Sequence, residues 1–252
     1  MDLYCFPGAA AGASSFRTWP AIAAGRVDVV SMQMPGREGR LGEPACTSIE
    51  AAVDGVGGGL RAAVGDRPYG LFGHSMGAYH AFECARRLLE AGARPPDVLV
   101  MAGARAPGWD AGADPDDTDE ALCDHLRRLG GTPQEVLDEP ELMDLLLPTL
   151  RADLGAVRSY MPAPGRLDVR SVVLAGGEDP LAPPSSMAGW LPWFQAEPAL
   201  VPRLGDHFFT TRRTTIEAVV RLCCGAPSHG LTKPPTASSP SHHLKESSDV
   251  LD

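Results

Sequence analysis

A serine flanked by two glycines, placed between an apolar strand and a long helical pattern, constrains this chain more than any other feature. The apolar run Tyr69–Phe72 leads into Gly73-His-Ser-Met-Gly77, and residues 76–91 then show apolar side chains at helical spacing. A turn this tight leaves no room for side chains at its flanks, so both glycines are needed. The turn is expected to lift the Ser75 hydroxyl above a sheet at the positive end of a helix, as a nucleophile elbow does.

A serine nucleophile needs a base and an acid that orients the base, and the sequence offers both at predicted strand ends. One apolar run, residues 171–175, leads into Asp179, and a second, residues 199–204, leads into His207. Catalytic residues of open α/β sheets usually follow the carboxyl ends of strands. The order Ser75, Asp179, His207 is the order found in α/β-hydrolases, so we predict these three residues as a catalytic triad.

Two other carboxylates compete with Asp179 for the role of the acid. Asp206 is adjacent to His207, and neighbouring side chains rarely face each other, while Glu178 is one residue out of phase. Asp179 also has a purely structural interpretation, since its side chain could cap a helix before Pro180. We favour Asp179 because it best satisfies the geometric roles of a triad.

Composition excludes several classes of function. The chain has 252 residues, enough for one sizeable core, and its formal net charge of −10 argues against nucleic-acid binding. No apolar run is long enough to span a membrane, and the N-terminus lacks the basic region of a signal peptide. The six cysteines show no metal-ligand spacing, so we expect a cytoplasmic protein without a metal site. The glycines at 55 and 57–59 follow no strand, so no dinucleotide cofactor is expected.

Predicted strands and helices alternate along the chain, which indicates a mostly parallel central sheet with helices on both faces. Strands are predicted at residues 3–6, 27–33, 69–72 and 97–102, with two more near 170 and 199. Helices are predicted at residues 15–24, 49–64, 76–91 and 210–224. We assign residues 1–225 to a single domain of the α/β-hydrolase fold. Residues 226–252, rich in Ser, Pro and His, are predicted to be a disordered tail.

Residues 107–165 interrupt this alternation with helical patterns alone. Helices are predicted at 118–129, 133–137 and 141–160, and Pro148 is expected to bend or divide the last of them. The segment carries 13 Asp and Glu residues against four Arg, which is nearly all of the net charge. A helical insertion between sheet strands is the usual form of a lid, with acidic side chains toward water. Five leucines are expected to roof a chamber below it: Leu142, Leu145, Leu146, Leu150 and Leu154.

Five segments together make the chain resemble the type II thioesterases, the free-standing editing enzymes of polyketide and nonribosomal peptide synthases. They occur in the order of the family and span about residues 3–224. They are Cys5-Phe-Pro-Gly-Ala9, Met34-Pro-Gly-Arg37-x-x-Arg40, Gly73-His-Ser-Met-Gly77, Leu147-Pro-x-Leu-Arg151-x-Asp153 and Gly205-Asp-His-Phe-Phe209. The second and fourth segments are not general hydrolase features, so the combination is far more specific than the elbow alone.

The resemblance implies hydrolysis of short or aberrant acyl groups from the phosphopantetheine arm of acyl or peptidyl carrier proteins. In such an enzyme His207 takes the proton of Ser75, which attacks the thioester carbonyl, and Asp179 orients the imidazole. The backbone N–H of Met76, the residue after the nucleophile, is the expected first oxyanion donor. The family pattern places the second donor at Ala9. We expect a monomer that uses no cofactor.

The chain departs from the family in its first loop, where Gly8 replaces a histidine or bulky residue and Ala10 and Ala11 replace a glycine pair. Three other functions remain open. One is a dedicated release of a finished polyketide from its carrier protein, and another is a carboxylesterase acting on small molecules. The third is a non-catalytic module that docks onto carrier proteins. The complete triad counts against this last function, because docking requires no such set of residues.

Overall fold

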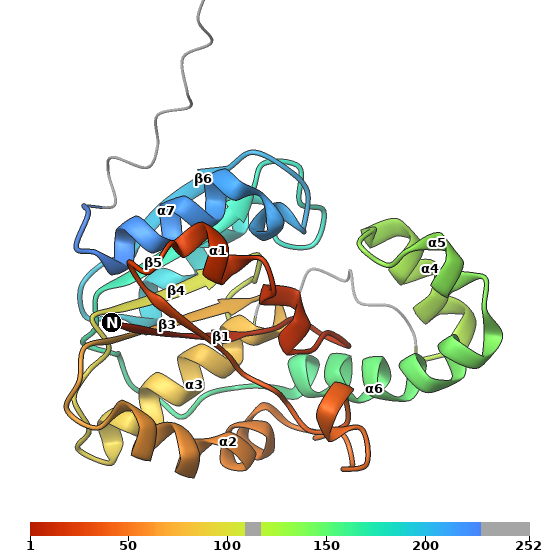
Figure 1. The fold of residues 1–252 in the computed structure, drawn as a ribbon, viewed down its shortest axis with the longest axis horizontal. Helices are drawn as coiled ribbons and strands as arrows, with labels where there is room; N and C mark the ends of the chain where they lie inside the picture. Colours follow the sequence, from red (N-terminus) through yellow and green to blue (C-terminus); the bar gives the residue numbers. More distant parts are fainter. Residues whose placement is uncertain (109–116, 228–252) are drawn as a thin grey trace, which may run out of the picture.

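The computed structural model describes residues 1–108 and 117–227, and the predicted disordered tail lies outside the described residues from position 228. Six parallel strands form one sheet in the order β2-β1-β3-β4-β5-β6 (Figure 1). The strands are β1 (Asp2–Phe6), β2 (Asp28–Ser31), β3 (Tyr69–His74), β4 (Val98–Ala102), β5 (Ser171–Gly176) and β6 (Ala199–Arg203). The predicted α/β sheet is therefore confirmed, and every described strand pair is parallel.

Helices cover both faces of the sheet. The helices α1 (Trp19–Ala23) and α7 (Arg213–Cys223) pack on one face, and α2 (Ile49–Val64) and α3 (Met76–Glu90) pack on the other (Figure 1). Successive strand residues point to opposite faces, so Leu71 lies in the core under α2 and α3 while Phe72 lies in the core under α1 and α7. Every helix among the described residues is too short or too polar to span a bilayer.

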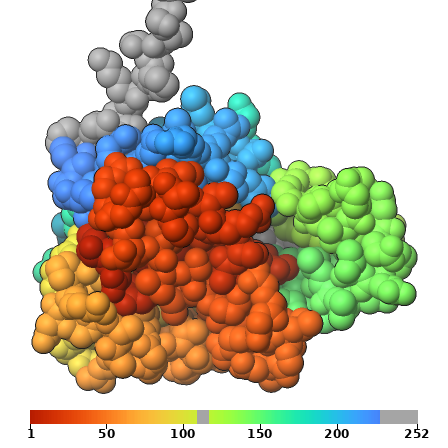
Figure 2. Space-filling view, in the orientation of Figure 1, coloured from red at the N-terminus to blue at the C-terminus, as the bar shows by residue number. Residues whose placement is uncertain are grey.

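The helices of the insertion predicted at residues 107–165 lie to one side of this body (Figure 2). Its described part holds α4 (Asp119–Leu129), α5 (Gln134–Leu137) and α6 (Pro140–Ser159). These helices bury a small apolar cluster of their own: Leu122, Leu126, Leu137, Met143, Leu147, Leu150 and Leu154. After α6 the chain is anchored on α3, where the hydroxyl of Tyr160 donates to the buried carboxylate of Glu83 at 3.0 Å.

Two predictions for the insertion are wrong. Leu142 and Leu145 were expected on the apolar face that roofs the chamber, yet they are 43% and 60% exposed. The buried face of α6 begins at Met143 and continues at Leu147. Because several leucines are consecutive in sequence, they fall on two faces of the helix, and only one of these faces is buried. Pro148 does not divide α6, which runs unbroken because buried residues on both sides of the proline pack into the same cluster; a bend at Pro148 stays a prediction.

The single helix expected at residues 15–24 is also wrong. The chain forms a short 3-10 helix, η1 (Ala13–Phe16), and then α1, which begins at Trp19. Pro20 has no N–H to donate to the carbonyl of Phe16, so one helix cannot continue through it; at the second position of α1 that donor is not needed. The closing helix is similarly preceded by a 3-10 turn, η4 (Phe209–Thr211). Two further 3-10 helices are η2 (Glu38–Arg40) and η3 (Pro184–Trp193).

Candidate active site

The turn between β3 and α3 has the geometry of a nucleophile elbow. Ser75 adopts φ 54° and ψ −124°, a conformation that non-glycine residues rarely hold, and its N–H donates to the carbonyl of Ala102 at 2.8 Å. A Cβ atom on Gly73 would lie 2.0 Å from the carbonyl oxygen of Gly77, and one on Gly77 would lie 2.1 Å from that of Phe6. The backbone therefore requires glycine on both sides of Ser75.

The chain brings four segments to the carboxyl edge of the sheet, although they are distant in sequence. The loop at residues 7–12 follows β1, Ser75 follows β3, Asp179 follows β5 and His207 follows β6. The strands β1 and β3 are neighbours, as are β5 and β6, and β4 joins the two pairs. Parallel strands end at one edge of a sheet, so this topology gathers the predicted residues there.

Asp179 and His207 form a buried pair. The Nδ1 atom of His207 lies 2.9 Å from Oδ2 of Asp179, and both residues are 2% exposed. The other oxygen of Asp179 accepts the N–H groups of Leu181 and Ala182 at 2.9 and 3.0 Å. Burial alone would raise the pKa of Asp179, but the hydrogen bond and charge of His207, together with these two donors, hold it below the ordinary value. The carboxylate therefore stays ionised and orients the imidazole.

The two rival carboxylates do not contact His207. Asp206 is exposed, and its side chain accepts the N–H of Phe208 at 2.9 Å. Glu178 is also exposed, one residue before the buried Asp179. Among the three acids weighed from the sequence, Asp179 is thus the one that the described structure pairs with the imidazole.

His74 has a role that the sequence reasoning missed. Its Nε2 atom lies 2.8 Å from the backbone carbonyl oxygen of His207, in the loop after β6. Burial, together with the nearby His207, lowers the pKa of His74 to about 3, so the imidazole is neutral and its Nε2–H donates to that carbonyl. Gly103 approaches closely, since a Cβ there would lie 3.3 Å from Nε2 of His74. The available signal was its place at the last residue of β3, directly before Ser75.

The loop after β1 lies against the nucleophile. A Cβ atom on Gly8 would lie 3.3 Å from the Cβ of Ser75. The N–H of Ala10 donates to Asp153 at 2.7 Å and that of Ala11 donates to Gly8 at 3.2 Å, whereas the N–H of Ala9 has no acceptor among the described residues. Met76 opens α3, where the first N–H groups lack an acceptor within the helix. The Ala9 and Met76 donors are thus unengaged within the described structure.

A buried ion pair joins the insertion to the sheet body, and the sequence reasoning had named its residues only as family signatures. The Nη1 and Nη2 atoms of Arg37 lie 2.6 and 2.8 Å from the two carboxylate oxygens of Asp153. Both side chains are almost fully buried. The two residues are 116 positions apart, so only the folded chain reveals the pairing.

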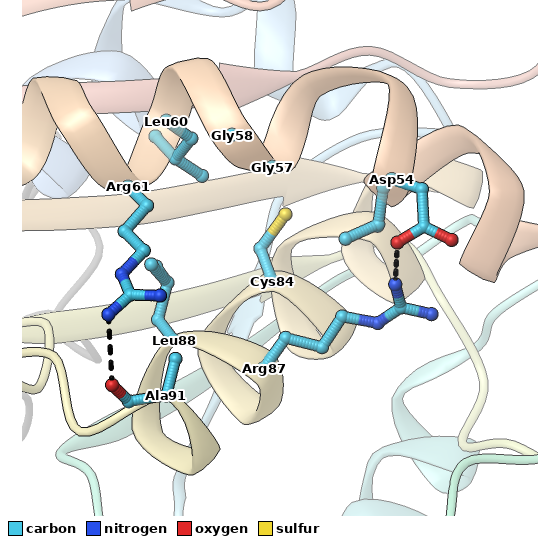
Figure 3. Close-up of a pocket in the computed structure, with 10 residues that line it drawn as sticks. Asp54, Gly57, Gly58, Leu60, Arg61, Cys84, Arg87, Leu88 and Ala91 are labelled. Atoms are coloured by element: carbon cyan, nitrogen blue, oxygen red, sulfur yellow. Dashed lines mark hydrogen bonds and ion pairs between the residues drawn. The ribbon is translucent and has the colours of Figure 1, made fainter.

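A cavity of about 260 Å³ lies elsewhere, between α2 and α3 (Figure 3). Arg61 donates to the carbonyl of Ala91 at one end, and Arg87 pairs with Asp54 at the other. The cavity holds the thiol of Cys84, whose pKa is raised by burial, so the thiol stays protonated. The carboxylate in the lining, Asp54, is paired with Arg87, and the described residues contain no cluster of three potential metal ligands.

The sequence matches the family model described as Thioesterase domain over residues 1–225, which is nearly the whole described chain. The chain belongs to the thioesterase family. Thioesterase PikA5 of Streptomyces venezuelae is 32% identical over 94% of this chain and 87% of its own length. The gramicidin S biosynthesis protein GrsT of Aneurinibacillus migulanus is 33% identical, over 83% of this thioesterase and 82% of its own length.

Solved structures agree with this assignment. RedJ, the thioesterase from the prodiginine biosynthetic pathway in Streptomyces coelicolor, superposes with a TM-score of 0.79 at 33% identity, covering 90% of each chain. The resemblance to type II thioesterases and the expected α/β-hydrolase fold are therefore confirmed.

Proposed function

We propose that this thioesterase hydrolyses acyl groups from the phosphopantetheine arm of carrier proteins and removes short or aberrant units from a polyketide or nonribosomal peptide assembly line. The buried Asp179–His207 hydrogen bond at the edge of the sheet that presents the Ser75 elbow is the observation that carries the proposal. Its relatives add the pathway context, because GrsT is named for gramicidin S biosynthesis and RedJ for the prodiginine pathway.

The proposed chemistry proceeds through an acyl-enzyme. His207 takes the hydroxyl proton of Ser75 as the oxygen attacks the thioester carbonyl, and the resulting imidazolium is stabilised by the ionised Asp179. Collapse of the tetrahedral intermediate breaks the C–S bond, and the imidazolium gives its proton to the departing thiolate. Water then attacks the acyl-enzyme with His207 again as base, releasing the acid and restoring Ser75.

The oxyanion formed in each step needs backbone donors. We assign Met76 and Ala9, whose N–H groups have no acceptor within the described residues. Ala9 is next to Ala10 in a loop that lies against Ser75, and Met76 begins the helix whose dipole favours negative charge. Each such donor contributes about 10²- to 10³-fold to kcat in comparable enzymes.

The helical insertion is proposed to act as a lid. Ala9 and Ala10 pack against its apolar cluster, so it borders the oxyanion loop. The turn between α4 and α5 also meets Phe208, since a Cβ on Gly131 would lie 2.4 Å from the ring. The insertion thus contacts the loops that carry both the oxyanion donor and His207, where its position can limit the size of the acyl group.

Parallel assays with butyryl-carrier protein and p-nitrophenyl butyrate test the proposed reaction class. We expect a higher kcat/KM on the carrier thioester, because the pantetheine arm adds binding energy that the small ester lacks. A clear preference for the nitrophenyl ester would instead favour a small-molecule carboxylesterase. Absence of turnover on both would favour a docking module without catalysis.

A further inference from the structure

Asp153 lies in α6, within the helical insertion, yet its carboxylate contacts the loop that carries Ala9. Its Oδ2 atom accepts the N–H of Ala10 at 2.7 Å and Nη1 of Arg37 at 2.6 Å, while Oδ1 accepts Nη2 of Arg37 at 2.8 Å. The pairing with Arg37 is bidentate and buried, the arrangement that gives the strongest and most directional of such contacts. One carboxylate therefore joins the insertion, the segment after β2 and the loop after β1.

The residue that Asp153 holds has an unfavourable backbone conformation. Ala10 has φ +56°, in the left-handed region where a Cβ atom is disfavoured. Such a conformation persists only when the surroundings impose it. The hydrogen bond from Ala10 to Asp153 supplies that restraint directly beside Ala9, whose N–H is the proposed oxyanion donor.

The segment after β2 holds the same loop at further points. Gln33 accepts the N–H of Ala13 at 3.0 Å, and Glu38 accepts the hydroxyl of Ser14 at 2.5 Å. This segment is itself tied to α6, because Thr149 donates its hydroxyl to the carbonyl of Gly36 at 3.3 Å. Side chains from outside the loop thus hold the chain at Ala10 and just after the loop, at Ala13 and Ser14 of η1.

We propose that Asp153 is a positioning residue for the oxyanion loop, coupling the placement of α6 to stabilisation of the tetrahedral intermediate. This inference rests on the proposed thioester hydrolysis. Asp153 holds Ala10 in its left-handed conformation, and the N–H of Ala9 is thereby aimed at the oxyanion. Because charge develops on that oxygen only during reaction, loss of the restraint should lower kcat and leave KM nearly unchanged.

Two variants separate this positioning role from simple structural support. Asp153→Asn keeps the size of the side chain and removes its charge and its bidentate pairing with Arg37. The double variant Arg37→Met with Asp153→Leu replaces the whole ion pair by apolar side chains, a change that buried pairs often tolerate without loss of stability. The double variant therefore keeps the test valid even where the single variant folds poorly.

Asp119→Asn is the matched control. Asp119 pairs with Arg151 within the same insertion, but its side chain is 73% exposed and contacts no part of the oxyanion loop among its described interactions. The control removes the same charge from the same insertion. Its kcat, KM and thermal midpoint should equal those of the unmodified chain.

Three measurements on the full chain test the coupling. For both Asp153 variants we expect kcat on a butyryl thioester to fall about 100-fold with KM changed less than about threefold. Affinity for butylboronic acid, which forms a tetrahedral adduct on the serine, should fall by a similar factor. Amide exchange at Ala10 should accelerate in both variants and stay slow in Asp119→Asn.

A folded double variant with the kcat and boronate affinity of the unmodified enzyme would overturn the coupling, as would an equal loss of kcat in Asp119→Asn. An unmodified chain inactive on every thioester would instead defeat the proposed function on which the coupling rests. The two failures are therefore distinguishable.

Discussion

The Nε2 atom of His74 lies 2.8 Å from the carbonyl oxygen of His207, so the residue before the proposed nucleophile supports the backbone of the proposed base. The ring centroids of the two histidines are 5.0 Å apart. Because burial keeps His74 neutral, with a pKa of about 3, this contact is a donor–carbonyl hydrogen bond at neutral pH. It joins the last residue of β3 to the loop after β6, across the span of the site.

His80 is a second buried histidine, and it predicts sensitivity of the fold to acid. Neither of its ring nitrogens has a hydrogen-bond partner among the described residues, and burial, with a smaller effect of Arg37, lowers its pKa to about 3. The unfolded chain takes up this proton near pH 6.5 and the folded chain does not. Stability is therefore fully present above pH 6.5 and is lost as pH falls toward 3, by up to about 1.4 kcal/mol per pH unit for each such histidine.

The variant His80→Leu tests this, since it removes one titrating group and an unsatisfied buried polar ring. We expect its free energy of unfolding in urea to fall less steeply between pH 6.5 and 4.5 than that of the unmodified chain. Identical pH slopes for the two proteins would show that His80 is not held neutral in the fold.

The variant Ser75→Ala should keep the fold and lose nearly all turnover. Loss of a triad serine costs roughly 10⁶-fold in kcat in a well-studied protease. A phosphonate probe should label Ser75 in the unmodified chain and nothing in the variant, as read by mass spectrometry of peptides. Turnover that survives in the variant would rule out Ser75 as the nucleophile.

The choice of the acid predicts a large difference between two aspartates. Asp179→Asn should lower kcat by about 10⁴-fold, because the amide no longer holds the tautomer of His207 that can accept the serine proton. Asp206→Asn is the matched control, and its cost should be small because the exposed Asp206 side chain contacts only a backbone N–H. The reverse ranking in steady-state kinetics would assign the role to Asp206.

Contact between the insertion and Phe208 can be isolated with two neighbouring glycines. Gly130 and Gly131 have φ values of +76° and +83°, so an alanine at either position introduces backbone strain, of about 1–3 kcal/mol. A Cβ on Gly131 would meet the Phe208 ring, whose centroid is 5.5 Å from that of His207, whereas one on Gly130 meets nothing within 4 Å.

We therefore expect both alanine variants to lose stability, and only Gly131→Ala to lose activity, by about tenfold in kcat/KM. Thermal unfolding and kinetics on one thioester suffice for the comparison. Equal activity of the two variants would mean that the Phe208 contact does not influence the site.

The sequence predicted those parts of the molecule that depend on local patterns. The parallel sheet follows from apolar runs bounded by turns, and the elbow follows from glycines that the backbone sterically requires at 73 and 77. The buried face of α6 could not be predicted from its local sequence pattern. Leu145, Leu146 and Leu147 are consecutive, so one face of the helix cannot bury all three, and only packing against α4 and α5 selects Leu147.

Contacts between distant segments could not be predicted from local patterns either. Nothing in the spacing of Arg37 and Asp153 reveals that they meet, and the sequence treats His74 as one more residue of the elbow. Both contacts depend on the meeting of segments that different strands carry to one edge of the sheet. They surround the proposed site, where the function depends on geometry that local patterns do not encode.

The editing role is tested most directly by one panel of carrier-bound substrates, from acetyl, propionyl and butyryl groups to a full-length polyketide, assayed with the unmodified enzyme. Because the insertion contacts both the proposed oxyanion loop and Phe208, the residue after His207, we expect it to limit the acyl group to a small chamber. We expect faster hydrolysis of the three short groups than of the long chain. A strong preference for the full-length polyketide would contradict it and identify a dedicated release enzyme.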